Sequence, residues 1–177
     1  MLKGEKIVLD FISYSDLELI LKWRNEQKIA QFFREYRILS FEQQKNWFLK
    51  INHAENNSDY FFLIRTISKN EPIGVCGLNY IHWINRTAQL SLYIGKNNIY
   101  IDNKGWAEEA CNLLELFGSK NLNLNKIYCE VYEFDEKKIQ LLKNANYNLE
   151  GRFEKHIFKN GRYYDSLFFG KLISAKN

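Results

Sequence analysis

The stretch Thr87–Gly118, TAQLSLYIGKNNIYIDNKGWAEEACNLLELFG, decides the fold, because it combines a strand, a loop and a helix in direct succession. Residues 90–94 favour a strand, and a helical apolar pattern follows the loop at Ala107, Ala110, Cys111, Leu114 and Phe117. Such a helix directs unpaired backbone N–H groups at whatever lies before its first turn, where its macrodipole favours negative charge. Gly105 and the small Ala107 leave room for an anion. The stretch predicts a phosphate site, or a plain turn in which the glycine serves geometry alone.

The spacing Asp102-x-x-Gly105-x-Ala107 resembles the Gln/Arg-x-x-Gly-x-Gly/Ala loop of the GCN5-related N-acetyltransferases, the GNAT family. In that family the backbone amides of the loop hold the diphosphate of acetyl-CoA. The resemblance therefore implies a cofactor-binding loop made of Asp102, Asn103, Lys104, Gly105, Trp106 and Ala107. The segment NKGWAEEA is similar to the version in ribosomal-protein N-terminal acetyltransferases. Asp102 departs from the pattern, and an acidic side chain there should weaken diphosphate binding unless it turns away.

Composition predicts one folded domain over residues 1–177, with 46% hydrophobic and 26% charged residues. The net charge of +4 suits an anionic ligand but is too diffuse to indicate nucleic acid. Cys76, Cys111 and Cys129 lie far apart, without the spacing of a zinc or redox site. No apolar run reaches transmembrane length, and the N-terminus lacks the apolar core of a signal peptide. We expect a cytoplasmic protein with no metal and no membrane partner.

The remaining pattern predicts further strands and helices in a defined order. Strands are expected at 7–12, 60–67, 73–84, 126–132, 147–158 and 162–172, the last two joined by Asn160-Gly161. Helices are expected after the capping boxes Ser15-x-x-Glu18 and Ser40-x-x-Gln43, over 26–33, and from Asp135 to Asn144. This order resembles the GNAT fold. The resemblance implies an α/β (α+β) protein with a mixed, mostly antiparallel sheet of about seven strands, helices on both faces, and splayed fourth and fifth strands.

In the GNAT fold the pantetheine arm of the cofactor lies between the two splayed strands. The resemblance implies that backbone groups near Tyr93 and Ile94 pair with this arm, and that one N–H there serves the oxyanion. Members often carry a tyrosine acid in the helix after strand five. In that register Asp135 and Lys138 face the cofactor and Leu142 takes the tyrosine position, so this acid is missing.

Tyr93, Glu130 and His82 are the candidate catalytic residues, because each can reach the cleft if its strand face points inward. The alternatives remain open. Glu130 can equally be a solvent-facing strand position, and a histidine such as His82 is more often at the surface or hydrogen-bonded in the core. Trp106 either covers the core or packs on the cofactor.

An aromatic and basic segment around residues 31–37 predicts the acceptor wall. The candidate substrate-binding residues are Arg24, Asn25, Phe33, Arg34, Tyr36 and Arg37. The KWRN lead-in and its spacing to Phe33 resemble amino-sugar N-acetyltransferases of flagellin glycosylation. We therefore expect acetyl transfer to the primary amine of a nucleotide-linked amino sugar.

Three alternatives stand beside this expectation: a protein N-terminus as acceptor, a non-catalytic CoA-binding module, and a single-stranded RNA binder. The RNA binder would use basic and aromatic residues of the final hairpin, namely Arg152, Phe153, Lys155, Phe158, Lys159, Arg162 and Tyr163. Such alternation is usually only the two faces of a hairpin, so we expect no nucleic-acid partner. The exposed edge of the hairpin makes a homodimer a reasonable expectation.

Overall fold

The computed structural model describes residues 1–53, 55 and 57–173. Its elements are β1 (Leu2–Lys3), β2 (Ile7–Asp10), η1 (Tyr14–Asp16), α1 (Leu17–Asn25), α2 (Gln27–Ala30), α3 (Phe41–Ile51), β3 (Tyr60–Thr66), β4 (Pro72–His82), β5 (Thr87–Ile94), η2 (Lys96–Asn98), α4 (Trp106–Lys120), β6 (Lys126–Tyr132), α5 (Glu136–Asn144), β7 (Asn148–Lys159) and β8 (Arg162–Leu172). The expected order of elements is confirmed, with the short strand β1 added at the N-terminus.

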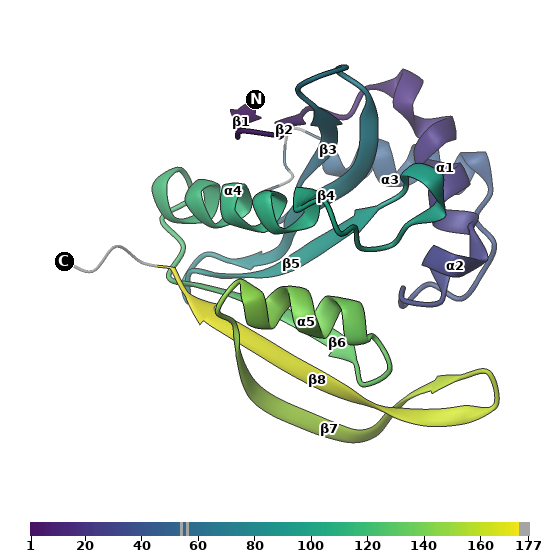
Figure 1. The fold of residues 1–177 in the computed structure, drawn as a ribbon, viewed down its shortest axis with the longest axis vertical. Coiled ribbons are helices and arrows are strands. Elements are labelled where there is room, and N and C mark those ends of the chain that lie inside the picture. The colour runs from purple at the N-terminus through teal and green to yellow at the C-terminus, as the bar shows by residue number, and fades with distance from the viewer. Residues whose placement is uncertain (54, 56, 174–177) are drawn as a thin grey trace.

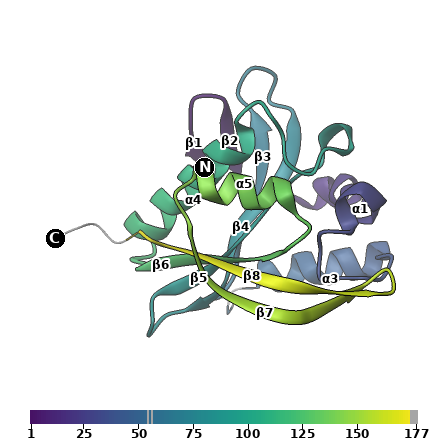
Figure 2. The same ribbon diagram turned by 60° about the horizontal axis from the view of Figure 1, so that its bottom comes forward.

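A single eight-stranded sheet in the order β1-β2-β3-β4-β5-β6-β8-β7 forms the centre of the described chain. All neighbouring strands pair antiparallel except β5 and β6, which are parallel. Helices α4 and α5 cover one face of the sheet and α3 lies on the other (Figures 1 and 2). The expected mixed sheet with helices on both faces is confirmed.

Strands β5 and β6 diverge soon after they begin. They pair only over Thr87–Gln89 and Lys126–Tyr128, although β5 continues to Ile94 and β6 to Tyr132. The remaining backbone of β5 therefore faces a wedge instead of a neighbouring strand. This wedge is the predicted splay, and it creates room for a ligand inside the sheet.

Local sequence explains several element boundaries. Ser40 caps α3, because its side chain accepts a hydrogen bond from the Gln43 N–H at 3.2 Å and the Gln43 side chain returns one. The capping box expected at Ser15 and Glu18 is wrong: the pair is Ser13 and Asp16, two residues earlier. The β7–β8 turn at Asn160 and Gly161 is confirmed, and both residues have positive φ, which a tight hairpin turn requires.

The helices of the described residues are too short and too polar for any of them to cross a membrane.

Candidate functional site

A cavity of about 530 Å³ opens in the wedge between β5 and β6. Its floor is formed by the diverging strands, one side by α5, and the other by α1 and the segment that follows α2. The volume lies in the range of small-molecule and cofactor sites. The lining includes expected residues from separate parts of the chain, namely Arg24, Phe33, Arg34, Tyr36, Arg37, Tyr93, Glu130, Asp135 and Lys138.

The loop before α4 is closed by its own acidic residue. The Asp102 carboxylate accepts hydrogen bonds from the backbone N–H groups of Lys104 at 2.7 Å, Trp106 at 3.0 Å and Ala107 at 2.8 Å. Gly105 permits this arrangement, because it adopts a left-handed conformation with φ of 82°. Asp102 therefore does not turn away from the loop; its carboxylate takes the N–H groups that the resemblance assigns to the diphosphate.

The turn between β1 and β2 docks against this loop and brings a cation to it. The Lys6 ammonium donates to the Lys104 carbonyl at 3.0 Å, while the Glu109 carboxylate accepts from the Glu5 and Lys6 N–H groups. The Lys104 ammonium lies 4.8 Å from the centre of the half-buried Trp106 ring. Sequence reasoning missed Lys6, since this contact spans almost a hundred residues. Asn103 and Lys104 are exposed at the tip of the loop.

On the β5 side of the wedge, backbone groups that point away from β4 already have partners. The Leu92 carbonyl accepts from the Lys138 ammonium at 2.6 Å, and the Ile94 N–H donates to the Tyr100 carbonyl at 2.8 Å. Lys138 is only 5% exposed. The Ile94 N–H is thus bonded within the chain in this structure, instead of standing ready for an oxyanion.

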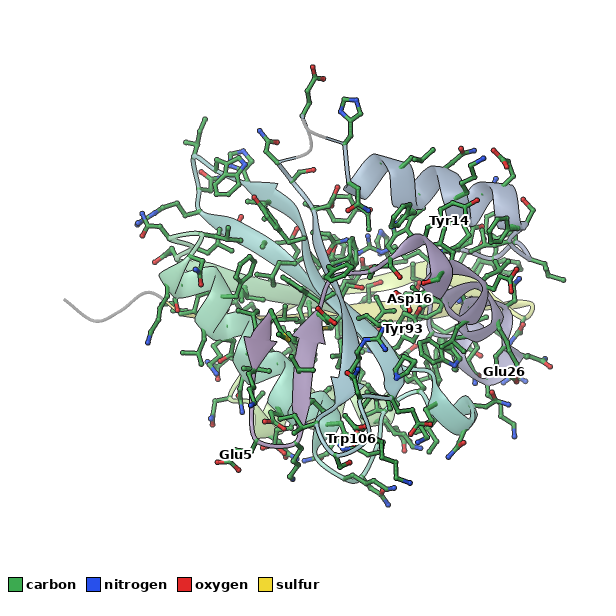
Figure 3. The ribbon with its side chains drawn as sticks, turned by 90° about the horizontal axis from the view of Figure 1, so that it is seen from above. Glu5, Tyr14, Asp16, Glu26, Tyr93 and Trp106 are labelled. Carbon is green, nitrogen blue, oxygen red and sulfur yellow. The ribbon has the colours of Figure 1, made fainter. Side chains whose placement is uncertain are left out.

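Tyr93 lies in the interior of the molecule, while Trp106 lies nearer its rim (Figure 3). The Tyr93 hydroxyl is buried and has no hydrogen-bond partner among the described residues. The Tyr93 ring packs edge-on against Phe33, with 5.1 Å between the ring centres. Burial raises the pKa of the Tyr93 phenol, so the hydroxyl stays neutral and remains a donor.

Helix α5 contributes the buried Asp135 to the cavity. Its carboxylate caps the helix by accepting from the Lys138 N–H at 3.0 Å. Burial raises the pKa of Asp135, and the nearby Lys138 ammonium offsets this only in part. Leu142, which takes the tyrosine position that the resemblance implies, is fully buried in the core.

Glu130 on β6 is the centre of a polar cluster on the opposite wall. Its carboxylate pairs with the Arg34 guanidinium and accepts from the Ser166 hydroxyl at 2.7 Å. His156 Nδ1 lies 3.0 Å from the Ser166 oxygen and 3.6 Å from the Glu130 carboxylate. Ser166 and His156, on the β8–β7 hairpin, were not identified from the sequence. Glu130 is thus a cavity residue whose side chain is 7% exposed, and the solvent-facing alternative is wrong.

The expected acceptor wall is only partly assembled at the cavity. Arg24 lies over the Phe33 ring at 5.9 Å, and Arg37 pairs with Glu35 through two hydrogen bonds. Tyr36 is 89% exposed at the mouth. Asn25 is not a lining residue; its amide exchanges two 2.9 Å hydrogen bonds with the Leu39 backbone and so fixes the chain between α2 and α3.

Two other expectations are placed away from the cavity. His82 is exposed at the end of β4, where its ring accepts from the Asn85 N–H at 3.1 Å, so it is not a catalytic candidate. Two basic residues of the final hairpin have internal partners: Arg152 pairs with Asp165, and Lys159 donates to the carbonyls of Gln31 and Phe33. Strand β7 forms the outer edge of the sheet (Figure 1), the position from which we expected self-association.

Comparison with known proteins agrees with this geometry. The sequence-family model described as acetyltransferase (GNAT) domain matches residues 9–168 of this chain. A spermidine N(1)-acetyltransferase of Vibrio cholerae is 28% identical over 162 residues, which are 92% of this chain and 90% of that protein. The acetyltransferase PseH of Campylobacter jejuni is 25% identical over 138 residues, 78% of this chain and 80% of PseH.

Among solved structures, a Vibrio cholerae spermidine N-acetyltransferase in complex with CoA and spermine superimposes with a TM-score of 0.86. It is 25% identical, and the match covers 96% of each chain. The expected family and the expected cofactor are therefore confirmed. The match over most of the sequence shows that this chain belongs to the GNAT family, acyltransferase enzymes whose acetyl donor is acetyl-CoA.

Proposed function

We propose that residues 1–177 form one N-acetyltransferase domain that transfers the acetyl group of acetyl-CoA to the primary amine of a nucleotide-linked amino sugar. The observation that carries the choice of acceptor is the charge balance at the cavity. Four cationic side chains line it, Arg24, Arg34, Arg37 and Lys138, against three acidic ones, Glu35, Glu130 and Asp135.

Each of these carboxylates already has a partner within the chain. Glu35 bonds to Arg37, Glu130 bonds to Arg34, and Asp135 accepts from a backbone N–H beside the Lys138 ammonium. Among the described residues, the Arg24 guanidinium has no carboxylate within ion-pairing distance and lies over Phe33. Arginine recognises phosphate oxygens in a bidentate manner, and aromatic rings such as Phe33 and Tyr36 pack on flat ligand groups. A nucleotide-linked sugar meets both requirements, through its diphosphate and its flat base.

For the cofactor, we propose that the arm of acetyl-CoA enters the wedge along β5 beside Tyr93 and Ile94. Its diphosphate would meet the loop of residues 102–107, and Asp135 and Lys138 on α5 would border the arm. The position of the cavity along β5 and the CoA-bound relative support this assignment. The N–H groups of the loop are held by the Asp102 carboxylate in the unliganded structure.

For the chemistry, we propose Glu130 as the carboxylate that receives the acceptor amine. It lies in the cavity wall opposite β5, where a carboxylate oxygen can accept a hydrogen bond from the acceptor amine and then its proton. His156, 3.6 Å away and 46% exposed, connects Glu130 to solvent and can pass on the proton that the amine loses. The buried, neutral Tyr93 hydroxyl supplies a donor for the thioester oxygen or the departing thiolate. This donor replaces the tyrosine absent at Leu142.

A polyamine is the second candidate acceptor, because the Vibrio cholerae relatives are named for spermidine. A polyamine carries several positive charges and needs carboxylates that are not already neutralised. The ion pairs of Glu35 and Glu130 with arginine oppose this acceptor.

The test is a CoA-release assay with acetyl-CoA and four acceptors in parallel: a UDP-linked 4-amino sugar, the same amino sugar without its nucleotide, spermidine, and an alanine-starting peptide. We expect the highest kcat/KM with the nucleotide-linked sugar and a loss of at least tenfold when the nucleotide is removed. Faster turnover of spermidine or of the peptide would replace the proposed acceptor. Tight CoA binding without turnover of any amine would instead identify a non-catalytic CoA-binding module.

A further inference from the structure

The backbone N–H groups of the loop before α4 are already bonded to an anionic group of the chain itself, the Asp102 carboxylate. The Asp102 carboxylate occupies the N–H groups of Lys104, Trp106 and Ala107 at 2.7–3.0 Å. These distances are those of charge-assisted hydrogen bonds, which are stronger than neutral ones. A diphosphate that used the same N–H groups would have to remove this carboxylate first.

A second, independent contact shows the same kind of internal pairing further along the expected cofactor path. Lys138 is 5% exposed, and its ammonium bonds to the Leu92 carbonyl at 2.6 Å. That carbonyl belongs to the part of β5 that has lost its neighbour β6. The Asp102 carboxylate thus accepts hydrogen bonds from backbone N–H groups of the loop, and the Lys138 ammonium donates to a backbone carbonyl of β5. Polar backbone groups at both positions are therefore satisfied by side chains of the chain itself.

We propose that Asp102 is a displaceable internal counter-anion that sets the affinity of this enzyme for acetyl-CoA. The diphosphate of the cofactor displaces the Asp102 carboxylate from the three N–H groups, and the carboxylate moves into solvent. The free energy that the carboxylate contributes to the unliganded protein is subtracted from the free energy of cofactor binding. This proposal rests on the proposed function, in that it assumes that CoA binds at residues 102–107.

The test compares wild type with Asp102→Ala by calorimetric titration with CoA, and with pantetheine as a probe that lacks the diphosphate. In the absence of ligand, Asp102→Ala should melt at a lower temperature, because an N-terminal cap of α4 is lost. In the presence of CoA it should bind about 2- to 30-fold more tightly, the range that corresponds to the usual ~0.5–2 kcal/mol value of a helix cap. The affinity for pantetheine should not change.

Ser40→Ala is the matched control. Ser40 caps α3, does not line the cavity, and accepts one backbone N–H at 3.2 Å. Its loss should also lower the melting temperature while CoA affinity stays at the wild-type value. A rise in affinity confined to Asp102→Ala therefore reports displacement and not a general loosening of the fold.

The outcomes separate the two levels of inference. CoA affinity that is unchanged or weaker in Asp102→Ala would overturn the displacement proposal, since the carboxylate would then act only as a cap or would assist the cofactor. In that case the proposed acetyl transfer still stands, because wild type binds CoA. If neither protein binds CoA, the proposed cofactor site itself is wrong.

Discussion

Glu130→Gln is the substitution that tests the proposed chemistry most directly. Glutamine has the shape of glutamate and can still accept the Ser166 hydrogen bond of 2.7 Å, but it carries no charge for the amine or for Arg34. A positioned acid or base is typically worth 10²–10⁴-fold in rate. We therefore expect kcat/KM to fall by about 10²–10⁴-fold, or about 3–5 kcal/mol of transition-state stabilisation.

The same substitution should leave the fold nearly intact. The Arg34 side chain is 51% exposed, so its pair with Glu130 resembles a surface ion pair, worth about 0.2–1 kcal/mol. The melting temperature should then fall by no more than about 4 °C for a chain of this size. A large loss of rate with a small loss of stability distinguishes a chemical role from a structural one.

Steady-state CoA release with saturating acetyl-CoA and varied acceptor, together with thermal unfolding, measures both quantities. Glu133→Gln is the control, because Glu133 follows β6 but bonds to the Asp165 N–H and lies near Arg152 outside the cavity. Arg34→Ala tests whether Glu130 serves only to hold the arginine. If Glu130→Gln kept kcat/KM within threefold of wild type, or if Arg34→Ala reproduced its whole loss, the assignment of Glu130 to the amine would be refuted.

Two further predictions concern stability. Burial raises the pKa of Asp135 above its value in the unfolded chain, so its charge costs the fold stability, and this cost develops as pH rises from ~3.9 through the folded pKa. Asp135→Asn should therefore raise the melting temperature relative to wild type at pH 7 but not near pH 3. Gly95→Ala should destabilise by about 1–3 kcal/mol, or about 2–12 °C, because its Cβ would lie 2.1 Å from the Trp23 ring.

Each of these has an opposite outcome that is easy to recognise. A melting difference between Asp135→Asn and wild type that is constant from pH 3 to pH 7 would show that charge burial is not its cause. Gly151→Ala is the control for Gly95, since the nearest neighbour of its Cβ would be 4.0 Å away. Equal melting temperatures of the two glycine variants would show that the Trp23 ring can move aside without a loss of folding free energy.

The strand and helix periods of the sequence predicted most of the elements, because apolar patterns and the Asn160-Gly161 turn are local signals. The splay was expected only from the resemblance to the GNAT fold. The side-chain pairings were not predictable in the same way. The placement of His82 rested on strand alternation, but β4 has a register shift between Asn79 and His82, and Tyr80 has a φ of 52°. An irregular strand loses its period of two, so the face of His82 could not be read from the pattern.

Long-range contacts explain the other differences. Ser166 and His156 reach Glu130 only because β8 pairs with β6 and because β7 is irregular between Phe153 and Ile157. For Asp102, the rule that an acid repels a phosphate was sound. That rule did not predict which groups the Asp102 carboxylate would bond to, because its position depends on the left-handed conformation of Gly105.

The contact between Lys159 and the segment after α2 has a mechanical consequence. Its ammonium, whose pKa burial lowers, donates to the carbonyls of Gln31 and Phe33 and so ties the tip of the β7–β8 hairpin to the region that precedes Arg34. A displacement of that tip would therefore pull on the backbone that precedes Arg34. The two hydrogen bonds thus brace this flank of the cavity against the outer edge of the sheet.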